Sequence, residues 1–74
     1  MGKVFQPGMM GKVVGCDYVK VRKKVGSEYV VESGNKLKVG TIVELLGYDP
    51  SAGRYKIDYK SKDGYIYKDY VELL

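Results

Sequence analysis

Histidine and tryptophan are absent from this chain of 74 residues, and cysteine occurs only once. Without histidine, the chain lacks the commonest general base and the commonest metal ligand. A lone Cys16 excludes an intramolecular disulfide and a metal site made of several cysteines, and no histidine can activate its thiol. Because free cysteine is commonly buried, we interpret Cys16 as a small core residue. These absences argue against an enzyme and predict no metal and no cofactor.

Long hydrophobic runs are also missing, since the apolar pairs at 13–14 and 42–43 are among the longest uninterrupted stretches. A membrane-spanning helix needs about 20 consecutive apolar residues, so no membrane insertion is expected. The first residues, MGKVFQPGMMGK, contain no continuous apolar segment of the kind found in a signal peptide. If the natural protein is exported, its signal lies upstream of this sequence.

Charge is moderately positive, with thirteen Lys and Arg against nine Asp and Glu and a formal net charge of +4. This excess suits an anionic partner without requiring one. Basic residues gather at 20–24 and again at Lys36 and Lys38. Lysine on an exposed strand edge discourages sheet-to-sheet association, so we interpret both groups as solvated strand edges. The hydrophobic share of 45% and the charged share of 30% are typical of one small globular domain.

Strand patterns replace helical ones along the chain. No window of eleven residues has apolar positions at helical spacing without a glycine or proline in it. Residues 12–16 are rich in valine, and then Val19 and Val21 alternate with polar neighbours, which predicts a strand whose valines face the core. Further strands are expected within 41–48, 55–59, 65–67 and 71–73.

Turn residues separate these strands. Residues 23–35 form the longest candidate loop, and Tyr29 lies inside it. Residues 49–53 suit a tight reversal, Lys62-Asp63-Gly64 predicts a hairpin turn, and 68–70 predicts one helical turn. Carboxylates at Asp58, Asp63 and Asp69 are better explained by turn formation than by catalysis. The predicted fold is all-β, a small five-stranded, partly open barrel over 11–74 with one short helical turn before the last strand, preceded by an N-terminal extension or linker at 1–10.

Five sequence pieces occur in a fixed order: YVKVR at 18–22, a loop with tyrosine at 29, LKVGTIVELLG at 37–47, RYKIDY at 54–59 and DGYIYKDYVEL at 63–73. In this order and spacing they resemble the bacterial SH3-like (SH3b) domain family, over about residues 11–73. Members typically carry a Leu-Asn-Val-Arg strand, a variable loop, a Gly-Thr-x-Val-x-Val strand, a Trp-Tyr-Lys-Val strand and a Gly-Trp-Val segment. This chain has Lys23-Lys24-Val25 where Ser-Gly-Pro is usual, a longer 29–37 segment, and tyrosines, Tyr55 and Tyr65, in place of the two tryptophans.

The resemblance implies a five-stranded SH3-like barrel that acts as a non-catalytic binding module. Such modules commonly belong to larger cell-wall hydrolases, envelope proteins or phage proteins, and they recognise peptidoglycan, often its peptide part. The expected location is therefore extracellular or in the cell envelope, as part of a longer exported protein. An attached catalytic domain is a further candidate partner.

Tyrosines are the candidate ligand-binding residues, because rigid rings bury area at little entropic cost and each phenol can donate and accept a hydrogen bond. If Ile66 faces the core, its neighbours along the strand face away from it. Tyr29 and Tyr70 would approach that outward face from either side. Tyr55 shares a strand face with Ile57, so a partly buried position in the core is an alternative for it. Tyr48 and Tyr59 are interpreted as packing residues. The predicted site is Tyr29, Tyr55, Tyr65, Tyr67 and Tyr70.

Two other binding functions stay open. Nucleic-acid binding is suggested by lysines interleaved with tyrosines over 56–68, but Asp58, Asp63 and Asp69 interrupt this stripe, so it ranks lower. A protein-interaction module that contacts a partner or a neighbouring domain is the other alternative. Proline-rich peptides rank low as ligands, because Glu28 and Glu32 are the only acidic candidates in the long loop.

Overall fold

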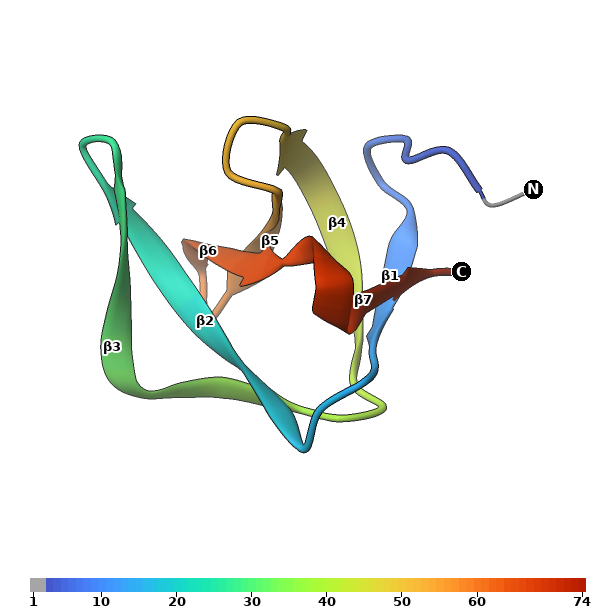
Figure 1. Ribbon diagram of the computed structural model, residues 1–74, viewed down its shortest axis with the longest axis horizontal. Helices are drawn as coiled ribbons and strands as arrows, with labels where there is room; N and C mark the ends of the chain where they lie inside the picture. Colours follow the sequence, from blue (N-terminus) through green and yellow to red (C-terminus); the bar gives the residue numbers. More distant parts are fainter. Residues whose placement is uncertain (1–2) are drawn as a thin grey trace.

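Antiparallel strands make up almost all of the protein, in a computed structural model that describes residues 3–74 (Figure 1). Over these residues the chain forms seven strands and a single 3-10 turn, so the all-β prediction and the helical turn before the last strand are confirmed. The strand number is seven instead of five. No helix in this part of the chain is long and apolar enough to cross a membrane. The elements are β1 (Met10–Val13), β2 (Tyr18–Val25), β3 (Glu28–Lys38), β4 (Ile42–Asp49), β5 (Arg54–Tyr59), β6 (Lys62–Tyr67), the 3-10 turn η1 (Lys68–Tyr70) and β7 (Val71–Leu73).

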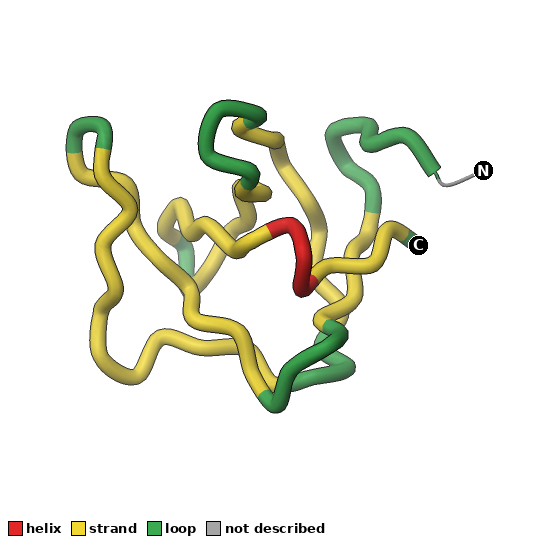
Figure 2. Tube along the Cα trace, viewed as in Figure 1, coloured by secondary structure: helices red, strands yellow, loops and turns green. Residues whose placement is uncertain are grey.

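One strongly bent sheet contains all of these strands, in the order β3-β2-β6-β5-β4-β1-β7 (Figure 2). The sheet is not closed, so β3 and β7 are its two edges. The central strands β6 and β5 pair over their whole length, from Arg54 opposite Tyr67 to Tyr59 opposite Lys62. Bending lets a single sheet enclose a core on its concave side, which a flat sheet of this size could not do.

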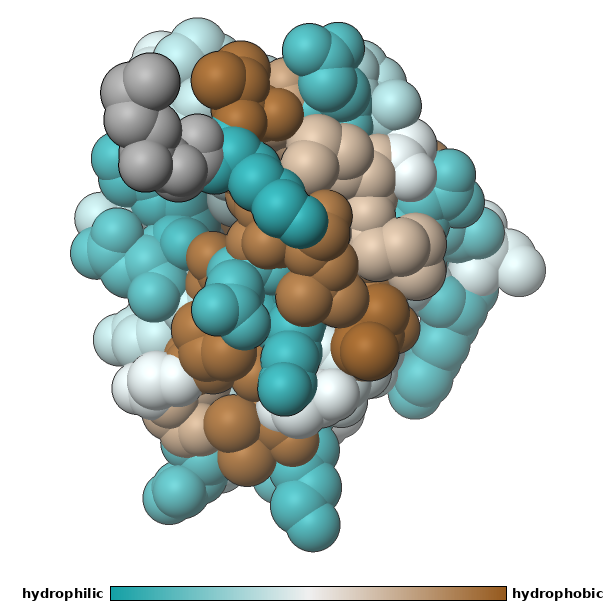
Figure 3. Space-filling model, turned by 90° about the vertical axis from the view of Figure 1, so that its right-hand side faces the viewer, coloured by the Kyte–Doolittle hydropathy of each residue, from teal (hydrophilic) through white to brown (hydrophobic). Residues whose placement is uncertain are grey.

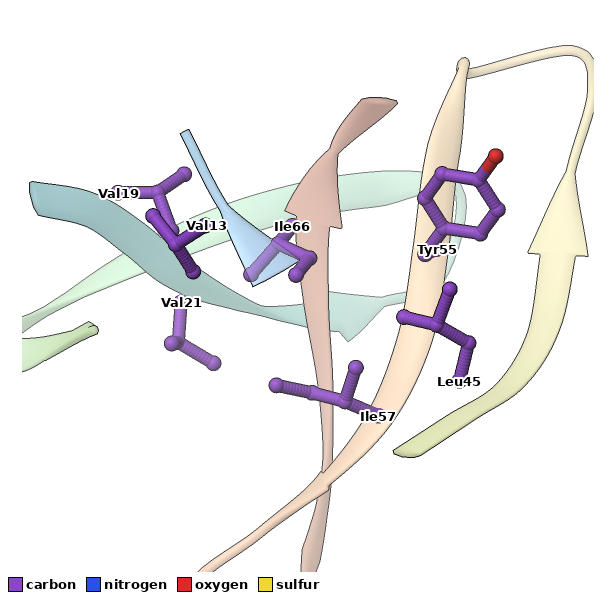
Figure 4. Packing of buried hydrophobic residues seen from close by; sticks show 7 residues of the cluster. All are labelled: Val13, Val19, Val21, Leu45, Tyr55, Ile57 and Ile66. Atoms are coloured by element: carbon purple, nitrogen blue, oxygen red, sulfur yellow. The ribbon is translucent and has the colours of Figure 1, made fainter. Parts of the chain in front are cut away.

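The core is small and is made by side chains from five strands (Figure 4). Val19 and Val21 are 5% and 3% exposed, which confirms the prediction that these two valines face inward. Ile66 is fully buried, so the assumed phase of β6 is also correct. Cys16 is half-buried and packs against the same cluster. The cluster consists of Val13, Val19, Val21, Leu45, Tyr55, Ile57 and Ile66.

Two glycines allow the strands to come close to one another over this core. A Cβ on Gly64 of β6 would lie 2.5 Å from Cγ1 of Val21 on β2. A Cβ on Gly11 of β1 would lie 2.8 Å from Cγ1 of Val71 and 2.9 Å from Cδ1 of Leu45. All three distances are below a real carbon-carbon contact, so any larger residue would push the sheet apart at these points.

The turn between β5 and β6 lies at residues 60 and 61, and the prediction that Lys62-Asp63-Gly64 forms it is wrong. Tyr59 pairs with Lys62, which leaves Lys60 and Ser61 as a two-residue turn with φ of 51° and 65°. Positive φ at both central residues is typical of the type I′ turn that suits the twist of a hairpin. Gly64 is instead required for close packing, and Asp63 is a strand residue whose carboxylate lies 3.4 Å from Lys56.

Residues 23–35 were expected to form a long loop, and this prediction is also wrong. They belong to the β2–β3 hairpin, which turns at residues 26 and 27, with Gly26 at a φ of 62°. The register shifts between Lys20 opposite Lys36 and Arg22 opposite Val31, so residues 32–35 bulge out of the pairing. Because β3 is an edge strand with little burial on either face, its sequence lacks the apolar alternation that identifies half-buried strands.

The segment before β1 packs against the sheet from Phe5 onward. The ring of Phe5 lies 5.3 Å from that of Tyr55 and 6.3 Å from that of Tyr48, centroid to centroid. The Gly8 amide donates a hydrogen bond of 2.8 Å to the carbonyl of Leu45, whose own amide donates to Met9. Of the 1–10 stretch predicted as an extension or linker, residues 1 and 2 lie outside the described residues.

Candidate functional site

Basic and aromatic side chains cover the outer surface of the sheet where β2, β6 and β5 meet. Since Val19, Val21, Tyr55 and Ile66 face the core, their neighbours along each strand face outward. Every one of these neighbouring positions holds a tyrosine, a lysine or an arginine. They are Tyr18, Lys20 and Arg22 on β2, Arg54 and Lys56 on β5, and Tyr65 and Tyr67 on β6.

A depression of about 430 Å³ lies on this surface, beside the 3-10 turn; we call it the groove. Tyr18, Tyr67 and Tyr70 line it, with exposed fractions of 48%, 36% and 38%. Within residues 3–74 these are the three most exposed aromatic side chains, and all three gather around one depression. Exposed rings that gather in this way are typical of a binding surface. The groove is further lined by Cys16, Lys20, Arg22 and Arg54.

Arg54 joins the groove to a second pair of rings. Its guanidinium carbon lies 5.5 Å from the ring centroid of Tyr67 and 5.1 Å from that of Tyr29. Tyr29 meets Tyr65 edge to face at 5.1 Å, and Tyr67 meets Tyr70 at 6.2 Å. Cation–π contacts with these two rings hold the guanidinium in place, while the N–H groups at the edge of the guanidinium plane can still donate hydrogen bonds.

Asp49, at the end of β4, holds the side chain of Tyr29 in place beside Arg54. The Tyr29 hydroxyl donates a hydrogen bond to Oδ2 of Asp49, while Oδ1 accepts bonds from the hydroxyl and the amide of Ser51. The bond from Tyr29, helped by those from Ser51, lowers the pKa of Asp49 to about 2. The same bond is the main reason why the pKa of Tyr29 is raised to about 12. Near neutral pH, Tyr29 is therefore a neutral donor to an ionised carboxylate.

The five tyrosines of the predicted site separate into three places. Tyr67 and Tyr70 line the groove. Tyr29 and Tyr65 form the adjacent pair, linked to the groove through Arg54. Tyr55 lies in the core, 9% exposed, with its ring 4.9 Å from that of Tyr48, and it does not line the groove.

Several residues of the groove were missing from the predicted site, among them Tyr18, Arg22 and Arg54. The signal for them was present in the strand phase. Tyr18 and Arg22 alternate with the inward valines of β2, and Arg54 alternates with the inward Tyr55. The sequence does not show that β2 pairs with β6. This pairing brings the outer faces of these distant segments together.

A second surface covers β1, β4 and β7, and apolar and charged residues alternate on it (Figure 3). Met10 and Ile42 are 42% and 54% exposed on this side of the sheet. Met10 pairs with Glu44 and Lys12 with Glu72, so charged side chains interrupt the apolar surface. This face therefore offers a mixed apolar and charged contact area.

One thiol, that of Cys16, lines the groove. This thiol lies 3.4 Å from the carbonyl oxygen of Val14, and the chain contains no histidine to activate it. Comparisons of the chain with protein-family models, with curated proteins and with solved structures find no match. What the chain binds is therefore inferred from its own residues and from the order of its sequence pieces.

Proposed function

We propose that this chain is a non-catalytic binding module that holds a short peptide of the bacterial cell wall in the groove. The observation that carries the proposal is that Tyr18, Tyr67 and Tyr70 surround one depression although they come from two strands and the 3-10 turn. Exposed tyrosines that serve only packing would be scattered, since single exposed aromatics are common on protein surfaces.

The chemistry of the groove suits a peptide. Rings already held by neighbours lose little entropy when they cover an extended chain, and their hydroxyls can pair with its amides. Arg22, Arg54 and Lys20 add donors for carbonyl or carboxylate groups. Peptidoglycan carries short peptides with several amide and carboxylate groups, so it offers partners to both kinds of side chain.

The order of the sequence pieces supports the choice of cell wall as the target. In our proposal the bent sheet is an SH3-like barrel of the bacterial type, with β1 and β7 added at one edge and the β2–β3 hairpin extended at the other. The 3-10 turn before the last strand fits this interpretation. The module would then serve a longer envelope, hydrolase or phage protein outside the cytoplasm, alongside that protein's catalytic or structural domains.

Cosedimentation with purified, insoluble peptidoglycan tests the proposal. The wild-type chain should move to the pellet, and Tyr70→Ala should stay in the supernatant at concentrations where wild type is half bound, a loss of about tenfold in affinity. Ile42→Ala is the matched control, because it truncates an exposed apolar residue on β4 and should sediment like wild type. If wild type stays in the supernatant with peptidoglycans of several types, the proposal is wrong.

A second candidate is contact with a partner protein or a neighbouring domain through the face over β1, β4 and β7. The exposed Met10 and Ile42 on this face favour it. Replacement of Ile42 with Asp should then abolish association with the partner while binding to peptidoglycan is unchanged. If Ile42→Asp alters neither association nor solubility of the longer protein, this face makes no such contact.

A further inference from the structure

Both arginines of the chain line the groove, and their positive charge favours a ligand with negative charge. Every ion pair within residues 3–74 is made by a lysine: Lys23 with Glu32, Lys24 with Asp49, and Lys56 with Asp63. Arg22 and Arg54 are in none of them, and no acidic residue lines the groove. The positive charge that lines the groove is therefore not balanced by an acidic lining residue, and a ligand with negative charge would neutralise it. The carboxylate of Asp49, which is opposite Arg54 in the β4–β5 pairing, is bound to Tyr29 and Ser51.

Arginine is also the side chain best suited to a carboxylate. Its planar guanidinium presents parallel N–H groups that match the two oxygens, whereas lysine offers a single point charge. Arg54 is already held between the rings of Tyr67 and Tyr29, at 5.5 Å and 5.1 Å. Because its position is fixed before binding, little side-chain entropy remains to be lost when it pairs with a ligand.

From these contacts we propose that the groove recognises a carboxylate of its peptide ligand, through Arg22 and Arg54. This inference rests on the proposed function, because it assigns a subsite within the same groove. Tyr18, Tyr67 and Tyr70 hold the peptide beside the carboxylate, and Lys20 adds positive charge at the rim. A peptide with a free carboxylate is therefore preferred to the same peptide with that carboxylate amidated.

A nucleic-acid phosphate could also pair with arginine, but the rings here are poorly placed for stacking bases. Nζ of Lys36 lies 4.6 Å from the ring centroid of Tyr18, and Arg54 lies over Tyr67. Tyr67 also meets Tyr70 in a tilted arrangement. Base stacking needs free ring faces, so these contacts favour a carboxylate ligand over single-stranded DNA or RNA.

Isothermal titration with a synthetic stem tetrapeptide, L-Ala-γ-D-Glu-L-Lys-D-Ala, tests the inference. Four forms are compared: both carboxylates free, both amidated, and each one amidated alone. The free form should bind about tenfold or more tightly than the fully amidated form, because a charge-assisted bidentate pair is lost on amidation. The two singly amidated forms show whether the C-terminal carboxylate or the free α-carboxylate of the γ-linked D-Glu is recognised.

Variants of the arginines locate the effect. In R22Q or R54Q, the free peptide should bind as weakly as the amidated one does to wild type, and amidation should make little further difference. R22K and R54K keep the charge and should restore only part of the preference. Lys12→Gln on β1 is the control, since it removes one positive charge from the other face.

Each outcome is informative for one of the two proposals. Equal binding of free and amidated peptides overturns the carboxylate inference and leaves the groove as a peptide site. Binding to insoluble peptidoglycan without binding to any of the four peptide forms also overturns it, because another part of the wall, such as the glycan or a cross-link, is then recognised. Tighter binding of a dT oligonucleotide than of the peptide, lost in R54Q, would make the groove a nucleic-acid site and overturn both proposals.

Discussion

The hydroxyl of Tyr29 on β3 donates a hydrogen bond to the carboxylate of Asp49 at the end of β4. The bond joins two parts of the chain that are not paired in the sheet, because β3 is at an edge and β4 lies beyond β6 and β5. It also sets the Tyr29 ring against which Arg54 lies. The outer end of the groove therefore depends on this contact.

Acid stability should depend on this bond. The pKa of Asp49 is about 2 in the folded protein, against 3.8 ordinarily. Its contribution to the free energy of unfolding is therefore complete above about pH 4 and is lost as the pH falls toward 2. Tyr29→Phe removes the largest cause of the low pKa, so stability measured by urea unfolding should decrease less between pH 4 and 2 than in wild type. Tyr59→Phe is the control, and its free energy of unfolding should decrease between pH 4 and 2 as much as that of wild type. An equal decrease in all three proteins would contradict the assignment of the low Asp49 pKa to the bond from Tyr29.

Alkaline titration should identify the same tyrosine. The pKa of Tyr29 is about 12, whereas an exposed phenol ionises near 10. The neutral phenol's stabilising contribution is complete below about pH 10 and is lost as the pH rises through about 12. Ultraviolet absorbance of phenolate should show a late-ionising group that disappears in Tyr29→Phe and ionises earlier in Asp49→Asn. Burial also raises the pKa of Tyr55, so this second late group should remain in both variants. If Tyr29→Phe has as many late-ionising tyrosines as wild type, the assignment to Tyr29 is contradicted.

Gly64→Ala should destabilise the fold. The new Cβ would lie 2.5 Å from Val21 and 3.1 Å from Cβ of Tyr59, so β2 and β6 would have to separate. Overpacking of this kind costs about 1–3 kcal/mol, which urea unfolding measures directly. Gly47→Ala is a matched control on β4, because its Cβ would find Lys56 at 3.8 Å and the backbone is not in the left-handed region. Gly47→Ala should change stability by less than about 0.5 kcal/mol, and equal losses in both variants would contradict the close-approach argument.

The β5–β6 turn should be stabilised by the residues that its conformation prefers. Lys60 and Ser61 both have positive φ, which is unfavourable for residues other than glycine and asparagine. The double substitution Lys60→Asn and Ser61→Gly should raise the free energy of unfolding by about 1 kcal/mol. A decrease in the urea midpoint would show that the turn has a different conformation in solution.

Much of the inner face was predictable from sequence, and much of the outer face was not. The alternation at Val19 and Val21, and the phase of Ile66, identified core positions correctly because burial produces a period of two. The hairpin of β2 and β3 was missed because an edge strand with two exposed faces has no such period. The turn at Lys60 was missed because Asp63 and Gly64 carry a stronger local signal, which here serves packing instead.

The groove itself depends on long-range pairing. Tyr18 and Tyr67 are far apart in the sequence and line the same groove because β2 pairs with β6. Sequence phase correctly separated Tyr65 and Tyr67 from the core. It could not reveal that Arg54 would lie between Tyr29 and Tyr67, since that contact depends on the bent sheet and on the Tyr29 bond to Asp49.

The most direct test of the groove as the ligand site uses Cys16, the single cysteine of the chain, which lines it. The rate at which a maleimide modifies this thiol is measured with and without soluble peptidoglycan fragments. A bound fragment should slow the reaction in proportion to the fraction of protein bound, and in Tyr70→Ala the same fragment concentration should have little effect. An unchanged rate at a fragment concentration that saturates binding would place the ligand elsewhere on the protein and contradict the assignment of the groove.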